Sequence, residues 1–279
     1  MGKTNDTPLA PEDYVESRCL LCGEEYGAPV MRPIPQRRIT EKTDEYMSRR
    51  DYAGVERHLS YWLEEARLER DLRGEFYICG EHVGHYRKTG EREKMIIYAA
   101  REIELIGILG FEGTVSAGTA YVNVATAYNA FGENEKSMEF FRRAKEAYEN
   151  AGCTDPDLLG GLYNNMALAC VALSRFDEAD EYFRRALETM ENAPQGELEC
   201  AMTLLNMADA ACARCGAEEA EGTIYDLLDR ARAYFDGDHP RDGYYAFVCE
   251  KCAPSFEYYG YFADAKELSR RAEEIYERA

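Results

Sequence analysis

The sequence has no apolar run approaching ~18 residues, and its opening stretch, MGKTNDTPLAPEDY, is polar. A membrane-spanning helix needs about 20 mostly apolar residues and a secretory signal needs an apolar centre, so we expect neither. Basic residues are also scarce, with 33 Lys and Arg against 53 Asp and Glu, which gives a net charge of −20 over 279 residues. Because nucleic acid and anionic membrane would be repelled by this charge, we expect neither as a partner.

Patterns typical of enzymes are missing as well. The sequence has no phosphate-binding loop and no Gly-rich dinucleotide turn. His82 and His85 share a predicted helix, but no serine or cysteine nucleophile accompanies them in a recognisable pattern. We therefore expect a protein that is not an enzyme and that carries no cofactor other than the structural zinc considered below.

What the sequence does contain is a repeat. Between Tyr163 and Glu191, two stretches with apolar residues at i, i+3, i+4 and i+7 flank a predicted turn at 174–177. A small or apolar residue opens the second helix of each copy at spacings of 40, 42, 42, 41 and 45 residues: Val55, Met95, Ser137, Ala179, Ala220 and Ala265. Two helices of this length cannot bury both apolar faces alone, so the copies must stack on one another.

The third and fourth copies keep the pattern best. Counted from the first position of each copy, the third fills positions 4, 7, 8, 11, 20, 24 and 27 with Tyr121, Val124, Ala125, Tyr128, Ser137, Phe141 and Ala144. The fourth fills them with Tyr163, Met166, Ala167, Cys170, Ala179, Phe183 and Ala186. This pattern resembles the tetratricopeptide repeat, and the 42-residue length with Asp155-Pro156-Asp157 opening a helix resembles the kinesin-light-chain kind.

The resemblance covers roughly residues 40–279. It implies an all-α fold, a right-handed tetratricopeptide-repeat superhelical solenoid of about six helix-turn-helix units. We expect residues 39–279 to form this solenoid and residues 1–38 to form an N-terminal extension. Pro33 and Pro35 predict an extended chain through MRPIPQRR, with helices starting near Thr40. Pro254 falls inside a first helix and predicts a kink or an early helix end.

On a helical wheel, positions 2, 6, 9 and 13 of each first helix lie opposite the packing face. By the resemblance, they line a concave groove. Position 6 is occupied by Glu81, Asn123, Asn165, Asn206 and Lys251, and position 9 adds Thr126 and Asp209. An asparagine amide carries a donor and an acceptor, so it can pair with an extended peptide backbone whatever its side chains. Peptide-binding members of the family, including kinesin-light-chain repeats and bacterial peptide-pheromone receptors, are similar in using concave asparagines.

We therefore predict a non-catalytic module that holds an extended peptide or partner-protein segment through a ladder formed by Asn123, Asn165 and Asn206. Three alternatives remain open. The asparagines could each satisfy only a neighbouring helix, with the chain acting as a scaffold through other surfaces. The basic MRPIPQRR segment could occupy the groove itself. The chain could also be a zinc-linked sensor.

The sensor alternative rests on Cys19 and Cys22, whose Cys-x-x-Cys-Gly spacing resembles half of a zinc knuckle. A structural zinc needs four ligands, and the nearest further candidates, Cys79 and His82, occupy packing positions 4 and 7. Cys249 and Cys252 occupy the same two positions, so packing is the better interpretation of both pairs. Ten cysteines in a chain without a predicted signal peptide favour free thiols in a reducing compartment, and we expect a cytoplasmic location.

Overall fold

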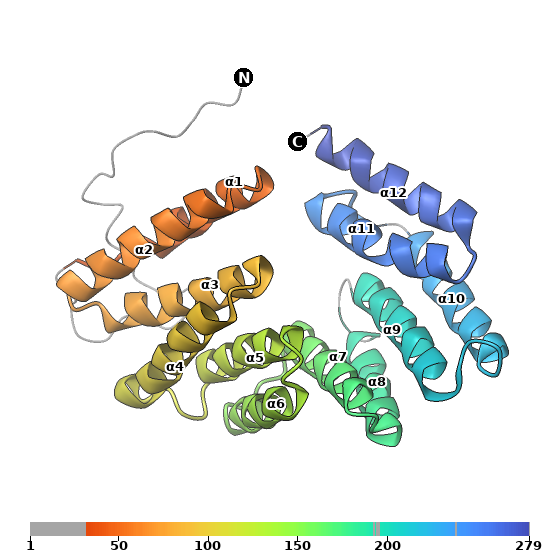
Figure 1. The fold of residues 1–279 in the computed structure, drawn as a ribbon, viewed down its shortest axis with the longest axis horizontal. Helices are drawn as coiled ribbons and strands as arrows, with labels where there is room; N and C mark the ends of the chain where they lie inside the picture. The colour runs from red at the N-terminus through yellow and green to blue at the C-terminus, as the bar shows by residue number, and fades with distance from the viewer. Residues whose placement is uncertain (1–31, 192, 194–195, 238, 279) are drawn as a thin grey trace. The chain divides into compact units, whose positions relative to one another are not determined.

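The computed structural model describes residues 32–191, 193, 196–237 and 239–278. Within these residues the chain forms twelve α-helices and no strand (Figure 1). Successive helices pair as antiparallel hairpins, α1 with α2 through α11 with α12, so that six helix-turn-helix repeats follow one another. The predicted all-α fold of about six repeats is confirmed. None of the helices in the described ranges is both long and apolar enough to cross a membrane.

The chain divides into two compact units. Unit 1 covers Met1–Cys153 and contains α1 (Gln36–Ser48), α2 (Tyr52–Leu68), α3 (Leu72–Thr89), α4 (Arg92–Leu109), α5 (Val115–Ala130) and α6 (Asn134–Asn150). Unit 2 covers Thr154–Ala279 and contains α7 (Pro156–Ala172), α8 (Phe176–Met190), α9 (Glu197–Cys215), α10 (Glu221–Phe235), α11 (Gly243–Tyr258) and α12 (Phe262–Tyr276). In each unit the first helix of one repeat also contacts the first helix of the next, as α3 contacts α5 and α7 contacts α9.

The predicted packing positions form the cores. In α5, Tyr121, Val124, Ala125 and Tyr128 are all buried, and Phe141 of α6 is fully buried against them. In unit 2 the equivalent Phe183 is fully buried, and a continuous apolar cluster runs through α8, α9, α10, α11 and α12. The residues at position 20, from Val55 to Ala265, are all buried between the paired helices, which is why the repeat can be recognised from its spacing.

The beginning of the first helix differs from the prediction. Residues 33–35 are non-helical as expected, but α1 begins at Gln36, so Gln36, Arg37 and Arg38 are helical rather than extended. Pro35 occupies the N-cap position, where its missing N–H costs nothing because the first amides of a helix have no partner within the helix. The second proline of MRPIPQRR thus starts the helix instead of delaying it.

Of the two outcomes expected at Pro254, a kink or an early helix end, the early end is not observed. The helix α11 continues through Pro254 to Tyr258, so it does not end early. Proline removes one backbone donor and crowds the carbonyl of Glu250, four residues earlier. Cys249, Cys252 and Phe256 on the same helix are buried in the unit 2 core, and this packing holds the helix together across the proline.

Candidate functional site

In unit 1 the position-6 asparagine lies between two neighbouring first helices. The side-chain Nδ2 of Asn123, on α5, donates a hydrogen bond of 2.9 Å to the main-chain carbonyl of Gly80, on α3. An asparagine amide has two N–H donors and an acceptor oxygen, so this bond uses only part of its capacity. Asn123 is partly exposed, and Thr126, one turn later, donates its hydroxyl to the carbonyl of Val122 at 2.7 Å. Asn123 therefore links α3 to α5 and keeps donor and acceptor atoms for a ligand.

Two carboxyl groups accompany Asn123 in unit 1. Glu81 on α3 is partly exposed, and burial together with the nearby Asp44 raises its pKa to about 7. Glu102 on α4 is 2% exposed, and its Oε2 has no hydrogen-bond partner among the described residues. Burial, and then repulsion from Glu81, raise the pKa of Glu102 well above its usual value. Because a buried unpaired carboxylate is costly, Glu102 is held in its neutral form.

Glu102 is not among the site residues expected from the sequence, although the sequence carries a signal for it. It occupies position 27, where the third and fourth repeats carry Ala144 and Ala186, so an acid at this position departs from the pattern. The structure shows what accommodates it: a Cβ atom placed on Gly80 would lie 2.8 Å from Oε1 of Glu102. The absence of a side chain at Gly80 makes room for this carboxyl group.

In unit 2 the two position-6 asparagines, Asn165 on α7 and Asn206 on α9, lie on helices that contact each other. Nδ2 of Asn206, on α9, donates to Oδ1 of Asn164, on α7, at 3.0 Å. The side chain of Asn165, the residue after Asn164, is partly exposed and makes no hydrogen bond to another described residue. Asn164 rather than Asn165 therefore reaches the following helix. Both donors and the acceptor of Asn165 remain available.

The other predicted residues of unit 2 are at the surface. Asp209, on α9, accepts a hydrogen bond of 2.8 Å from the hydroxyl of Tyr259. Lys251, on α11, is exposed and its ammonium lies 5.7 Å from the centre of the Phe247 ring. Phe247 is itself 48% exposed, so an aromatic surface and a cation lie together on this helix.

The cysteine and histidine pairs are in the cores, as the packing interpretation requires. Cys79, His82, Cys249 and Cys252 are all buried, and burial raises the pKa of the Cys79 thiol to about 12. A thiol of this kind is neither a nucleophile nor a ready metal ligand. Within the described residues, no group of three or more His, Cys, Asp or Glu side chains could hold a metal ion. Cys19 and Cys22 lie outside the described residues.

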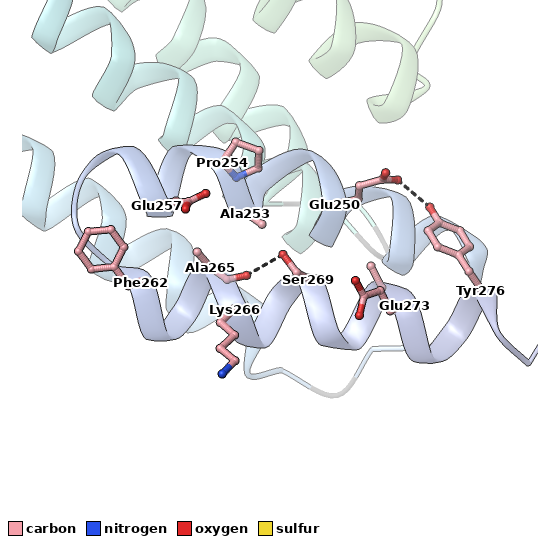
Figure 2. Close-up of a pocket in the computed structure, with 11 residues that line it drawn as sticks. Glu250, Ala253, Pro254, Glu257, Phe262, Ala265, Lys266, Ser269, Glu273 and Tyr276 are labelled. Carbon is pink, nitrogen blue, oxygen red and sulfur yellow. Dashed lines mark hydrogen bonds between the residues drawn. The ribbon is translucent and has the colours of Figure 1, made fainter. Parts of the chain in front are cut away.

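A hollow of about 490 Å³ lies over the last helix pair of unit 2 (Figure 2). Ala253, Ala265 and Ala272 line it, and Glu250, Glu257 and Glu273 surround them. Figure 2 shows the Tyr276 hydroxyl donating to Glu250 across one end of this α11–α12 hollow. Its three carboxylates against the single Lys266 make it an acidic surface.

Comparison with known proteins agrees with this architecture. Residues 116–192 match the family model of the tetratricopeptide repeat. The crystal structure of BtubC (BKLC) from P. vanneervenii is 17% identical over 86% of this chain and 89% of its own, with a TM-score of 0.50. Repeats of a Podosopora anserina protein described as a kinesin light chain, with nearly identical TPR-like repeats, are 16% identical over 71% of this chain and 92% of theirs, with a TM-score of 0.47. No curated protein matches the sequence.

The family match falls on α5, α6, α7 and α8, the helices of the two repeats whose sequences fit the signature best. Tetratricopeptide repeats mediate protein–protein interactions and are generally non-catalytic. The resemblance found in the sequence is confirmed: residues 116–192 match the tetratricopeptide repeat, and the described residues have the all-α tetratricopeptide-repeat fold.

Proposed function

We propose that the chain binds an extended segment of a partner protein along its first helices: in unit 2, Asn165 and Asn206 pair with the main chain of the segment, and in unit 1, Asn123 offers the same kind of pairing. The observation that carries this proposal is in unit 2. Asn165 and Asn206 lie on α7 and α9, which contact each other, and both have unused donors and acceptors. An extended peptide needs both kinds of group at successive positions.

Hydrogen bonds of this kind contribute ~1 kcal/mol each in net terms, so the asparagines orient the segment and other contacts supply most of the affinity. In unit 1, Glu81 and Thr126 accompany Asn123. In unit 2, Asp209 and Lys251 accompany Asn206, and the exposed Phe247 ring lies beside the ammonium group of Lys251. Charged and aromatic groups of this kind would select the side chains of the peptide.

The test begins with a partner captured by the wild-type chain and reduced to the shortest synthetic peptide that binds. Calorimetry then gives the Kd of that peptide for variants of unit 2. Asn165→Ala should weaken binding about tenfold, ~1.4 kcal/mol, with little change in folding stability. Asn206→Ala should weaken binding similarly, but it also removes the bond to Asn164.

Asn164→Ala is the matched control, because it removes the same bond between α7 and α9 while leaving Asn165 and Asn206 in place. It should lower stability as much as Asn206→Ala and leave the Kd nearly unchanged. Equal affinities for wild type, Asn165→Ala and Asn206→Ala would show that the asparagines only join helices. The chain would then bind its partner through another surface.

The zinc-linked alternative stays a prediction, because its ligands Cys19 and Cys22 lie outside the described residues. Metal analysis of chain purified without chelator tests it, and Cys19→Ser should lose the metal if the knuckle forms. Competition between the captured peptide and a synthetic MRPIPQRR peptide tests whether that segment occupies the groove. The cytoplasmic location is likewise a proposal, which imaging of the tagged chain would check.

A further inference from the structure

Besides the α11–α12 hollow of unit 2, the structure has a hollow of about 580 Å³ in unit 1, lined by residues of α2, α3 and α4. Ala66, Arg67, Arg70, Leu72, Glu75 and Arg101 line it. Three arginines around one glutamate give this lining two positive charges in excess, in a chain whose net charge is −20. None of the residues proposed to bind a peptide along the first helices is part of this arginine hollow.

Glu75 fixes two of the arginines. Glu75 is 4% exposed, and its carboxylate accepts hydrogen bonds from Nε of Arg67 at 2.9 Å, and from Nε and Nη2 of Arg101 at 3.0 and 2.8 Å. Burial alone would raise the pKa of Glu75, but the hydrogen bonds from Arg101 and Arg67 outweigh it and lower the pKa. Glu75 is therefore a buried, ionised group that holds both guanidinium groups in place.

The arginines keep donors that the protein does not use. A guanidinium has five N–H donors, and Arg67 gives only its Nε to Glu75 while its side chain is 53% exposed. Arg70 is exposed and has no ion-pair partner among the described residues. Arg101 also contacts Glu104 at 2.7 Å, but that carboxylate is 61% exposed, and an exposed pair of this kind contributes little.

From this arrangement we propose that the arginine hollow binds an oxyanion carried by a partner protein, the carboxylate of an acidic side chain or a phosphate on a modified one. Guanidinium groups match both oxyanions because their planar donors make paired hydrogen bonds. The hollow is far larger than the ~30 Å³ that one water molecule occupies in the liquid, so it can admit a side chain together with its charged end.

The experiment measures binding of three labelled peptides by fluorescence anisotropy: one with four consecutive glutamates, one with a phosphoserine, and a glutamine version of the first. Wild type should bind the glutamate or the phosphoserine peptide saturably and leave the glutamine peptide unbound. Comparing the first two peptides identifies which source of oxyanion the hollow prefers. Measurements at two salt concentrations should show weaker binding at high salt.

Arg70→Ala is the principal variant, because Arg70 makes no ion pair that folding would miss, and it should weaken binding about fivefold or more. Arg142→Ala is the matched control, since it removes the same charge from the exposed face of α6 in the same unit. It should leave affinity unchanged, as should Asn165→Ala, which separates this site from the first-helix site. The proposal is overturned if wild type binds neither anionic peptide, or if Arg142→Ala weakens binding as much as Arg70→Ala.

Discussion

Asn206 on α9 donates its side-chain amide to the side-chain oxygen of Asn164 on α7, 42 residues earlier and 3.0 Å away. This bond joins the first helices of two successive repeats through half-buried polar side chains. In unit 1, Asn123 makes the equivalent connection to the main chain of α3. The asparagines thus belong to the scaffold as well as to the proposed binding face, and variants must separate the two roles. Other contacts lead to predictions about stability that need no ligand.

Gly118 should not tolerate a side chain. A Cβ atom at this position would lie well inside van der Waals contact with the ring of Tyr148, which is buried and hydrogen-bonded to Thr119. Gly118→Ala should lower the free energy of unfolding by about 1–3 kcal/mol, as overpacking does. Urea denaturation of the chain followed by circular dichroism measures this change.

Gly84→Ala is the matched control for Gly118→Ala. Gly84 also lies within a helix of unit 1, but no heavy atom is within 4 Å of its added Cβ. Alanine should therefore stabilise α3 by about 0.5–1 kcal/mol. A similar loss of stability in both variants would contradict the packing described around Tyr148.

Asp71 should be less replaceable than Asp51, although both are helix N-caps. Each accepts a hydrogen bond of 2.8 Å from a glycine amide three residues later, but Asp71 is fully buried and its second oxygen also accepts from the Ile34 amide at 2.9 Å. Asparagine keeps one acceptor oxygen and places an NH₂ group against the other amide. Asp71→Asn should cost about 1–3 kcal/mol, and Asp51→Asn less than ~0.5 kcal/mol, because asparagine is an equally good N-cap.

Chemical denaturation of both variants checks this difference. Faster hydrogen exchange at the Ile34 amide in Asp71→Asn would show that the start of α1 has loosened from α3. Equal losses of stability in the two variants would mean that the bond from Ile34 contributes nothing.

Glu102 should make unit 1 less stable as the pH rises. Its folded-state pKa is raised well above the unfolded value, first by burial and then by Glu81. Its contribution is therefore fully present below the unfolded pKa of about 4.5 and is lost as the pH rises through the folded pKa. Glu102→Gln keeps the shape of the neutral acid and cannot ionise. Relative to wild type, its free energy of unfolding should increase between pH 5 and pH 8; a constant difference would contradict the assignment.

His82 should make unit 1 less stable as the pH falls. Its ring is fully buried, stacked 4.1 Å from Tyr98 and 5.4 Å from Tyr86, and neither ring nitrogen has a hydrogen-bond partner among the described residues. Burial, followed by repulsion from His85, lowers its pKa to about 3. Folding stability is thus retained above the unfolded pKa of about 6.5 and falls by up to ~1.4 kcal/mol per pH unit as the pH drops towards 3.

His82→Phe keeps the stacking and removes both the unpaired nitrogens and the titration. It should raise stability at neutral pH by ~1 kcal/mol and flatten the loss of stability between pH 6.5 and 4. Denaturant melts at several pH values measure the slope. An unchanged slope would place the acid-sensitive group elsewhere in the chain.

The fold could be predicted because the core positions recur at a fixed spacing. Ala179, Phe183 and Ala186 follow a helical period, and all three are fully buried. The start of α1 could not be placed correctly. A proline in a sequence indicates the absence of a helix, but Pro35 occupies the N-cap of α1, where it is compatible with a helix. Whether Asn164 or Asn165 reaches the next helix could not be predicted either, since the crossing of two helices decides it and a helical wheel describes only one.

The arginine hollow had no signal in the repeat pattern. Arg67, Arg70 and Arg101 come from a helix, a turn and another helix, and no common period connects them. Two of them, Arg67 of α2 and Arg101 of α4, meet because both donate hydrogen bonds to the buried carboxylate of Glu75 on α3. Charged residues that meet through a shared buried partner become visible only when the packing of the helices is known.

The fit of Glu102 to Gly80 limits how this chain can evolve by recombination between its repeats. Position 27 carries an acid only in the second repeat, and position 5 of that repeat is a glycine, where the next three repeats have Val122, Asn164 and Leu205. If α3 alone were replaced by the first helix of another repeat, the side chain in place of Gly80 would meet the carboxyl group of Glu102. If α4 alone were replaced, the loss of Glu102 would leave a gap beside Gly80. The helices α3 and α4 of this repeat are therefore matched to each other at Gly80 and Glu102, and exchanging either helix alone changes the packing around this carboxyl group.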